Sequence, residues 1–305
     1  GKAKPRPQKL RARKPQMKFM PHPALRCPLD SQPFEQHGAC LRCAAGPSFD
    51  IARQGYVNLL GAADKRSRDP GDNKAMISAR RAFLEAGHYQ AIADSLAQLV
   101  VPLCKADARA NAPFIVDAGC GEGYYLQQLA SALRHERTTP ASILGFDISK
   151  WAIQAATKRL PATWLVASNR HIPLADHSVD VLLSLFGFPE YAEFLRVLRP
   201  GGTLVLVHAG PRHLLELREI IYPDVRLTDS NQAAAAVRAG FRQLSQLAHR
   251  HTISLPDQAS IDQLLSMTPH LFRASAQGKE RVRTLNELAL GVDVVFELLQ
   301  SPTRP

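Results

Sequence analysis

Two patterns of apolar residues divide the chain near residue 113. Before this point, residues 76–84 and 89–103 carry apolar side chains three or four positions apart, which predicts two amphipathic helices. After it, short apolar runs alternate with segments of helical spacing, the pattern of a parallel sheet with crossover helices. The predicted strands are residues 114–117, 143–147, 164–167, 179–185 and 203–208.

The segments between these strands fit crossover helices. Leu126, Leu129 and Leu133 lie on one apolar stripe, and Ser149 is a suitable N-cap for a second helix. Near the C-terminal end, residues 252–255 and 292–299 add two further strands, although the second run is equally compatible with a helix. The sequence therefore predicts an α/β fold built on a mostly parallel, Rossmann-like, seven-stranded sheet.

The composition suits a globular protein with one large or two modest domains. The chain has 305 residues, of which 45% are hydrophobic and 21% are charged. Apolar runs such as residues 179–185 are far shorter than the roughly 20 residues that a membrane-spanning helix needs. We therefore expect a soluble protein with no membrane partner.

Most of the net positive charge lies at the start of the chain. The formal charge is +11, and eight cations without an acid lie in residues 1–18, so the rest of the chain carries 11 minus 8, or +3. Prolines and the lack of an apolar core predict that residues 1–26 are a disordered basic arm rather than a secretory signal. RNA binding and a solubilising extension explain this arm equally well.

The cysteines indicate a reducing compartment. There are five, an odd number in a chain without a recognisable signal peptide, which argues against a disulfide framework. We therefore expect a cytoplasmic location. Residues 27–60 combine turn residues with few apolar positions and predict a small ribbon-like domain.

The most informative motif is the glycine-rich turn after the first predicted strand, where residues 114–125 read FIVDAGCGEGYY. Glycines let the backbone turn sharply and approach a ligand closely. A dinucleotide loop spaces its glycines as G-x-G-x-x-G and favours phosphate. Here the spacing is G-x-G-x-G, and carboxylates at Asp117 and Glu122 favour a cation. The sulfonium of S-adenosylmethionine fits this field better than NAD does.

Three further features strengthen this interpretation. Asp147 ends the second strand, where a carboxylate can accept hydrogen bonds from both ribose hydroxyls, and the amide of Asn169 suits an adenine edge. A turn at residues 196–202 precedes an apolar strand. Together these features resemble the class I S-adenosylmethionine-dependent methyltransferases over about residues 113–208. The candidate cofactor residues in this stretch are Asp117, Gly119, Cys120, Gly121, Glu122, Gly123, Asp147 and Asn169.

The flanking motifs resemble a narrower family, the bacterial 23S rRNA (guanine-N1)-methyltransferases of the RlmA type. The resemblance covers the chain from about residue 27 onward and implies a homodimer that methylates a guanine in a 23S rRNA hairpin. It also implies a zinc ribbon in residues 27–60, a basic loop with helices in residues 61–110, and a methyltransferase domain with a substrate-binding C-terminal segment in residues 111–305. The motifs that carry it are residues 55–60, 65–72, 79–84, 87–89, 210–213 and 267–269.

The same resemblance implies two cofactor contacts outside the glycine loop. Tyr89 and His213 would contact the cofactor alongside Cys120 and Gly121. An aromatic or imidazole face suits a sulfonium cation. From the residues alone, a packed tyrosine and a surface histidine would be the simpler explanation.

The metal site departs from the ligand pattern of the family, which is Cys-x2-Cys followed by Cys-x3-His. Asp30 stands three residues after Cys27, where the second cysteine is expected. Pro47 stands four residues after Cys43, where the histidine is expected. Two of the four family ligands are therefore missing from their positions.

A rearranged zinc site is still conceivable because Cys40 makes a new Cys-x2-Cys pair with Cys43. Without a metal, Phe34 and Phe49 would have to hold the ribbon together by packing. The candidate ligands are Cys27, Cys40 and Cys43 with His37 or Asp30.

RNA recognition needs cations for the backbone and aromatic rings for unstacked bases. Phe186 and Phe188 follow the fourth predicted strand and could stack a base, although core packing explains either ring equally well. For Arg80 and Arg81, a solvated helix face is nearly as good an explanation. The predicted phosphate-facing group is Lys65, Arg66, Arg68, Arg80 and Arg81.

Methyl transfer to guanine N1 requires a direct displacement and the loss of one proton, but no covalent nucleophile. Cys120 is therefore interpreted as a loop residue rather than a catalytic thiol. The general base is unknown, with Asp69 and Asp72 as weak candidates. Asp69 as a turn residue and Asp72 as a helix cap are the structural explanations.

Two other functions stay open on sequence grounds. A small-molecule methyltransferase of the quinone-biosynthesis kind would share the core motifs, but the ribbon and the basic loop count against it. A non-catalytic RNA-binding protein would explain the degenerate ribbon, but the intact glycine loop and Asp147 count against that alternative.

Overall fold

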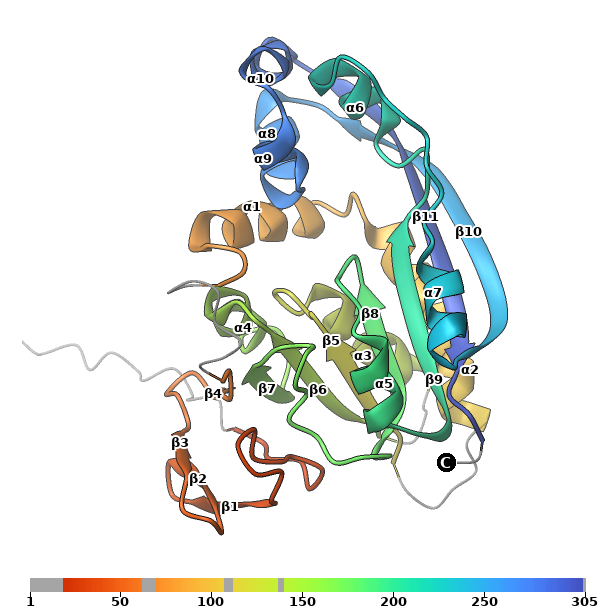
Figure 1. Ribbon diagram of the computed structural model, residues 1–305. Helices are drawn as coiled ribbons and strands as arrows, with labels where there is room; N and C mark the ends of the chain where they lie inside the picture. The colour runs from red at the N-terminus through yellow and green to blue at the C-terminus, as the bar shows by residue number, and fades with distance from the viewer. Residues whose placement is uncertain (1–18, 62–69, 107–111, 137–139, 304–305) are drawn as a thin grey trace, which may run out of the picture.

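An eight-stranded sheet forms the body of the protein in the computed structural model, which describes residues 19–61, 70–106, 112–136 and 140–303 (Figure 1). The strand order is β10-β11-β9-β8-β5-β6-β7-β4. The strands are β4 (Val57–Asn58), β5 (Phe114–Ala118), β6 (Ser142–Asp147), β7 (Thr163–Val166), β8 (Val179–Leu185), β9 (Leu198–Ala209), β10 (Arg242–Leu255) and β11 (Leu288–Gln300).

The sheet is parallel from β4 to β9 and antiparallel beyond it. β11 pairs antiparallel with β9, and β10 pairs antiparallel with β11. The predicted class I α/β fold is therefore confirmed, but the sheet has eight strands and not the predicted seven, because the short β4 pairs with β7 at its edge. The run at residues 292–299 is a strand and not a helix, because it lies inside β11, which is hydrogen-bonded on both sides by β9 and β10.

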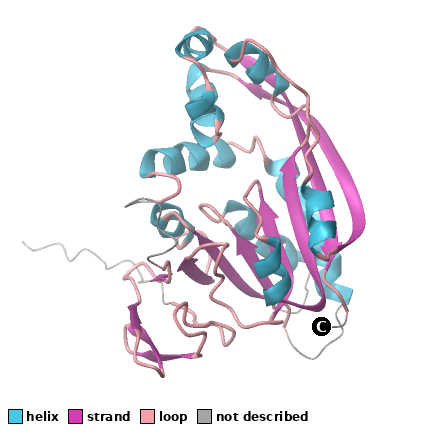
Figure 2. Cartoon of the chain, viewed as in Figure 1, coloured by secondary structure: helices cyan, strands magenta, loops and turns pink. Residues whose placement is uncertain are grey.

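Helices lie on both faces of the sheet (Figure 2), and apolar clusters fill the space beneath them. One cluster includes Phe83, Leu126 and Trp164, and the other includes Phe146 and Phe194. The helices are α1 (Lys74–Glu85), α2 (Gln90–Ala106), α3 (Tyr124–His135), α4 (Lys150–Ala156), α5 (Tyr191–Val197), α6 (Leu215–Ile221), α7 (Gln232–Ala239), α8 (Gln258–Met267), α9 (His270–Arg273) and α10 (Ala276–Arg283).

Two helix starts follow local capping chemistry. The side chain of Ser149 accepts the amide of Ala152, which confirms it as the N-cap of α4. The N-cap of α1 is Asn73, whose Oδ1 accepts two amides at 2.9 and 3.0 Å, so Asp72 is not the cap. Among the described helices, none is long and apolar enough to cross a bilayer.

The N-terminal region differs from the sequence prediction at two boundaries. Residues 19–26, assigned to the disordered arm, pack on the sheet domain, with Phe19 and Leu25 buried and the His22 ring stacked on Phe114 at 3.6 Å. β4 lies in residues 27–60 but pairs with β7 in the main sheet. Both errors arise because the apolar partners of these short segments lie far away in the sequence.

The ribbon itself is a separate three-stranded antiparallel sheet. Its strands are β1 (Phe34–His37), β2 (Cys40–Cys43) and β3 (Ser48–Asp50), in orange at the lower left of Figure 1. The rings of Phe34 and Phe49 meet edge to face at 5.5 Å, as the metal-free alternative requires. This small sheet buries few side chains, so contacts with the main domain contribute to its stability.

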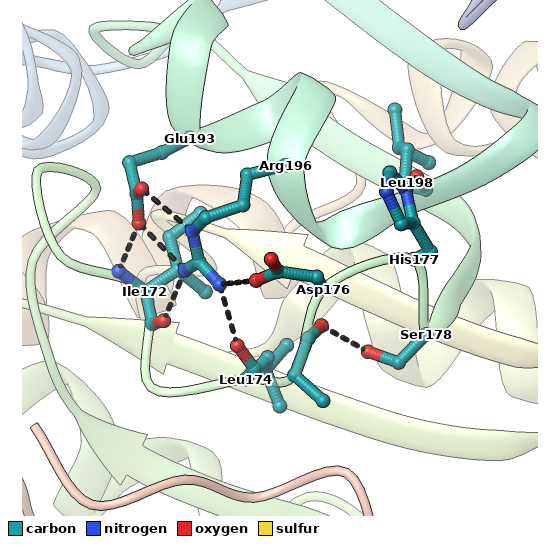
Figure 3. A network of polar contacts seen from close by, with 9 residues as sticks. Ile172, Leu174, Asp176, His177, Ser178, Glu193, Arg196 and Leu198 are labelled. Carbon is teal, nitrogen blue, oxygen red and sulfur yellow. Dashed lines mark hydrogen bonds and ion pairs between the residues drawn. The ribbon is translucent and has the colours of Figure 1, made fainter. Parts of the chain in front are cut away.

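Residues 196–202, predicted as a turn before the strand, are instead the end of α5 and the first part of β9, and Arg196 in this segment is a structural cation. The Arg196 guanidinium donates to Glu193 and Asp176 at 2.8 Å and to two backbone carbonyls of the segment after β7 (Figure 3). These contacts raise the pKa of Arg196, with Glu193 as the main cause. The network fixes α5 to residues 172–178 and does not include the cofactor loop.

Candidate cofactor site

The cofactor loop (residues 119–123) turns at the carboxyl end of the central strand β5. Gly119, Gly121 and Gly123 have positive φ values of 85°, 55° and 81°, a backbone region that favours glycine. The amides of residues 119 and 120 both donate to the carbonyl of Phe146, at 2.9 and 3.0 Å. The glycine spacing therefore permits a tight turn that is fixed to the neighbouring strand β6.

Asp147 ends β6 and lies beside this loop. Its Oδ2 accepts the amide of Gly121 at 3.0 Å, and its Oδ1 accepts the amide of Ser149 at 2.8 Å. Burial raises the pKa of Asp147, while these two hydrogen bonds and the charge of Arg80 oppose the rise. Each carboxylate oxygen can accept a further hydrogen bond. Asp147 is thus oriented by the backbone and retains capacity for a pair of hydroxyl donors.

Two buried oxygens at the same edge have no hydrogen-bond partner within the described ranges. They are Oδ1 of Asp117, on β5, and Oδ1 of Asn169, after β7. The Asn169 amide group is held by its Nδ2, which donates to the carbonyl of Phe188 at 2.9 Å. Burial, and then the charge of Asp147, raises the pKa of Asp117 to about 8. Unpaired buried acceptors are costly, so both oxygens fit a ligand that brings donors or positive charge.

Glu122 does not belong to this ligand-facing group, so its prediction as a cofactor residue was wrong. Its side chain is fully buried and forms a bidentate pair with Arg159, with N–O distances of 2.6 Å. Arg159 lies just beyond the end of α4, so the pair links the loop to that segment. The charge of Glu122 is therefore neutralised, and the carboxyl groups left to face a cationic ligand are those of Asp147 and Asp117. Asp117, with its raised pKa, must lose a proton when such a ligand binds.

Cys120 is a structural residue of the loop. Its side chain is buried, and burial raises the pKa of its thiol well above the ordinary value. A protonated, buried thiol is a poor nucleophile. What this residue can offer a ligand is its backbone.

An aromatic cluster lies next to the cofactor loop, at the carboxyl end of β8. The ring centroid of Phe186 is 6.4 Å from Tyr89, 6.5 Å from Tyr125 and 6.2 Å from His213. Phe186 has a φ of 54°, unusual for a non-glycine residue, and its side chain is 40% exposed. Phe188, two residues on, is 88% exposed. Rings in this arrangement suit a sulfonium cation and a flat base.

His213 and Tyr89 form a polar pair inside the cluster. Burial lowers the pKa of His213 to about 4, so the imidazole is neutral at neutral pH. Its Nδ1 accepts the amide of Asp293 at 3.3 Å, which places the proton on Nε2. Nε2 lies 3.3 Å from the Tyr89 hydroxyl oxygen and donates to it. The hydroxyl proton of Tyr89 is therefore left to donate elsewhere.

Asp293, on β11, holds the loop that carries His213. Its backbone carbonyl accepts the amide of Gly210 at 2.8 Å, and its Oδ2 accepts the amide of Arg212 at 3.0 Å. A Cβ on Gly210 would lie 2.6 Å from the Asp293 carboxyl group, so glycine is required there. The motif at residues 210–213 is thus folded around one buried carboxylate.

Arg80 was predicted to face RNA phosphates, but in the structure its guanidinium lies beside the cofactor loop. Its Nη1 lies 2.6 Å from Oδ2 of Asp72, and its Nη2 donates to the carbonyl of Met267 at 3.3 Å. Nη1 is also 3.6 Å from the point where a Cβ on Gly121 would be. Asp72 is engaged by this cation, which weakens its case as a general base.

The rest of the predicted basic group is only partly described. Arg81 pairs with Glu85 one helical turn away, at 2.8 Å, on a half-exposed face of α1. The other predicted residues, Lys65, Arg66, Arg68 and Asp69, lie outside the described residues, as does the basic arm up to residue 18.

The ribbon contains a candidate metal cluster made of Cys27, Asp30 and Cys43. One ligand atom from each lies within 4.8 Å of the other two. The Cys43 thiol donates to both carboxylate oxygens of Asp30, at 3.0 and 3.1 Å, which together with burial raises its pKa to about 11. Two sulfurs and a carboxylate are suitable donors for zinc, and they would supply three of its four ligands.

Cys40 is not part of this ribbon cluster, so the predicted ligand set is corrected by removing Cys40, while Asp30, one of its two predicted alternatives for the fourth ligand, lies in the cluster. Cys40 and Cys43 are the two ends of the extended strand β2, and residues three apart in a strand point to opposite faces. The Cys40 thiol donates instead to the carbonyl of His37 at 3.3 Å. His37 lies opposite Cys40 in the hairpin and is likewise remote from Cys43.

Sequence reasoning missed two residues of the site, Tyr125 and Asp293. Tyr125 lies two residues after Gly123, in the first turn of α3, and its ring is 6.5 Å from that of Phe186. Asp293 interrupts an apolar strand, and a carboxylate inside such a run requires buried partners. The carboxylate of Asp293 inside an apolar run was visible in the sequence, but the sequence did not show that the partners of Asp293 are Gly210 and Arg212.

Comparison with known proteins places this geometry in a family. Residues 25–68 match the zinc-ribbon family described as RlmA, N-terminal, and residues 115–202 match the methyltransferase domain family. A protein of Micromonospora griseorubida, provisionally named as a 23S rRNA (guanine-N(1)-)-methyltransferase, is 35% identical over 88% of this chain and 93% of its own length. The 23S rRNA (guanine(748)-N(1))-methyltransferase of Streptomyces fradiae is 33% identical over 92% and 96%.

A third relative matches only in part. The malonyl-[acyl-carrier protein] O-methyltransferase 1 of Coxiella burnetii is 33% identical over 47% of this chain and 49% of its own length. Only the first two relatives align over both the ribbon and the methyltransferase domain. From its glycine loop, its ribbon and this nearly full-length similarity, the chain belongs to the 23S rRNA (guanine-N1)-methyltransferase family.

Proposed function

We propose that this protein transfers a methyl group from S-adenosylmethionine to N1 of a guanine in a hairpin of 23S rRNA. The observation that carries the proposal is the 33% identity to the Streptomyces fradiae enzyme over 92% of the chain. The aromatic cluster beside the cofactor loop supports it, because it offers flat faces to both a sulfonium and a base.

The roles of the cofactor residues follow from their free bonding capacity. Asp147 would accept the ribose hydroxyls, and the unpaired Oδ1 of Asn169 would accept the adenine amino group. Asp117 would face the cationic half of the cofactor. The cofactor loop would bring its backbone amides against the ligand, and Tyr89 with His213 would bound the sulfonium side.

The chemistry needs positioning more than acid–base help. S-adenosylmethionine supplies an electrophilic methyl group, and guanine N1 must lie in line with the bond from sulfur to that methyl group. Phe186, held in its unusual backbone conformation between Tyr89 and His213, would stack the guanine so that N1 has this alignment. The N1 proton would leave to solvent as the methyl group is transferred and S-adenosylhomocysteine is released, and the Tyr89 hydroxyl, which keeps its own proton, would hydrogen-bond the guanine.

The RNA contacts are proposed on the same basis. The exposed ring of Phe188 would stack a neighbouring unpaired base, and Arg81, with Lys65, Arg66 and Arg68, would contact phosphates. We further propose a homodimer that works in the cytoplasm, in keeping with the resemblance described above.

A small-molecule substrate is less well supported. The similarity to the Coxiella burnetii enzyme covers 47% of this chain, whereas the similarity to the rRNA enzymes includes the ribbon. A carrier-bound or free small substrate would give the ribbon no role.

Primer extension on 23S rRNA tests the proposal. Methylation at N1 removes a Watson–Crick donor, so reverse transcriptase should stop at one guanine in rRNA from cells that carry the gene. The stop should vanish on deletion and return with the wild-type gene but not with Asp147→Ala. The same stops in all four strains would reject the rRNA substrate.

A further inference from the structure

The Arg80 guanidinium lies between the cofactor loop and the helices above it. It comes from α1, pairs with Asp72 just before that helix, and reaches the carbonyl of Met267 at the end of α8. These contacts join segments up to 187 residues apart in sequence. Its side chain is 24% exposed, so the cation is held in place without being sealed from the site.

This cation has hydrogen-bonding capacity left over. A guanidinium has five N–H donors in a planar fork. Asp72 accepts one N–H of Nη1, and the carbonyl of Met267 accepts one N–H of Nη2. Within the described ranges, Arg80 has no third hydrogen-bond acceptor. A second acceptor that approaches from the loop side would find donors already oriented.

The surrounding charges indicate what that acceptor is. Asp147 and, once a cation has displaced its proton, Asp117 place carboxylates at this edge of the sheet, which suits the sulfonium, the ammonium and the ribose of the cofactor. S-adenosylmethionine also has one anionic group, the carboxylate of its methionine part. Each of the three nearby arginines has an acidic partner, which is Glu122 for Arg159, Glu85 for Arg81 and Asp72 for Arg80. Arg80 differs because its guanidinium lies against Gly121 of the cofactor loop.

We infer that Arg80 binds the carboxylate of S-adenosylmethionine and selects for cofactors that carry it. Arg–carboxylate pairs are frequently bidentate and charge-assisted, so the interaction adds both affinity and orientation. Asp72 acts as a positioning residue, because its pairing with Nη1 fixes the plane of the guanidinium. The carbonyl of Met267 holds the opposite terminal nitrogen in the same plane.

An RNA phosphate is the competing ligand for this cation. A phosphate in a polynucleotide would have to reach a guanidinium that is three-quarters covered and in contact with the cofactor loop. The position therefore favours the small carboxylate. The inference rests on the cofactor and does not depend on the identity of the RNA substrate.

Calorimetry with cofactor analogues tests the inference. The wild type and Arg80→Met are titrated with S-adenosylhomocysteine, S-adenosylmethionine and decarboxylated S-adenosylmethionine. We expect Arg80→Met to lose about tenfold to hundredfold in affinity for the two carboxylate ligands, the effect of removing a charged hydrogen-bonding pair. The affinity for the decarboxylated analogue should change less than about twofold. Arg80→Lys should fall between the two proteins.

The matched control is Arg134→Met, which removes an exposed cation at the end of α3 farthest from the cofactor loop, where its Nη2 donates to Ser131. It should bind all three ligands as the wild type does, and thermal unfolding should show that both variants are folded. Equal losses of Arg80→Met for all three ligands, or no loss, would overturn the inference. Weaker binding of an rRNA hairpin with unchanged cofactor affinity would assign Arg80 to a phosphate instead. If the wild type binds none of the three ligands, the cofactor assignment itself fails.

Discussion

The cofactor edge and the ribbon cluster are both built on short sequence motifs, but they differ in how their polar groups are satisfied. At the cofactor edge, Asp117 and Asn169 each retain a buried oxygen to which no group in the described ranges donates a hydrogen bond. In the ribbon cluster, the Cys43 thiol and the Asp30 carboxylate already satisfy each other. The first site is organised for a ligand, whereas the second can hold its shape by internal hydrogen bonds.

The difference reflects which residues each motif has kept. The glycine loop retains every glycine that its positive φ values require, and Asp147 retains both backbone partners. The ribbon retains two cysteines of its family pattern and has replaced the other two ligands. Loss of a ligand is tolerated where a hydrogen bond can replace the metal, but no internal contact can replace a cofactor.

The largest effect is expected at the cofactor edge. Asp147→Ala removes the proposed acceptor for two ribose hydroxyls, and each such hydrogen bond is worth at least about 1.5 kcal/mol when the acceptor is charged, so affinity for S-adenosylhomocysteine should fall by about 100-fold or more. Calorimetry measures this loss. Asp176→Ala, which removes a 66% exposed carboxylate far from the loop, should bind normally. Equal affinity in both variants would mean that Asp147 is structural only.

A smaller effect on cofactor affinity is expected from a change of pH. Because burial and Asp147 raise the pKa of Asp117 to about 8, this group is largely protonated at pH 7, and a cationic ligand must displace that proton. Binding should therefore release a proton, and affinity should rise with pH up to about 8, by at most about tenfold per pH unit. Asp117→Asn cannot release this proton and should show a weaker pH dependence.

Titrations between pH 6.5 and 8.5 in buffers of different ionisation enthalpy measure the proton release directly. Wild-type affinity that is flat or falls with pH would contradict the raised pKa. A slope unchanged in Asp117→Asn would assign the dependence to a titrating group other than Asp117. Either result would break the contrast between an open cofactor edge and a closed ribbon cluster.

The smallest effect on function is expected at the ribbon. Pro47→His restores the fourth donor at its family position, so zinc should bind more tightly by about tenfold or more, since the loss of even an outer partner costs about that much. Competition with a chelator measures the affinity, and Pro47→Gln is the control. Cofactor affinity should be the same in all three proteins. Equal zinc affinity for His and Gln would show that residue 47 does not face the cluster.

The strands and the glycine loop were predictable because their signals are local. Apolar runs such as Val179–Leu185 are buried along nearly their whole length, and positive φ at Gly119 or Gly121 needs no partner to be inferred. The short β4 and the packed residues 19–26 carry no such signal. Their burial depends on a sheet formed by segments more than 100 residues away.

The sequence alone determined the fold class, the turn that approaches the cofactor, and the family. Only the tertiary structure decided which charges face the ligand. Glu122 is neutralised by Arg159, which is 37 residues away. Arg80 lies at the cofactor loop, where the carbonyl of Met267, 187 residues away, accepts its hydrogen bond. In the ribbon, the residue beside Cys43 is Asp30 and not Cys40. The reason is physical: a motif sets backbone conformation through local sterics, but the direction and charge of a side chain depend on partners supplied by distant segments.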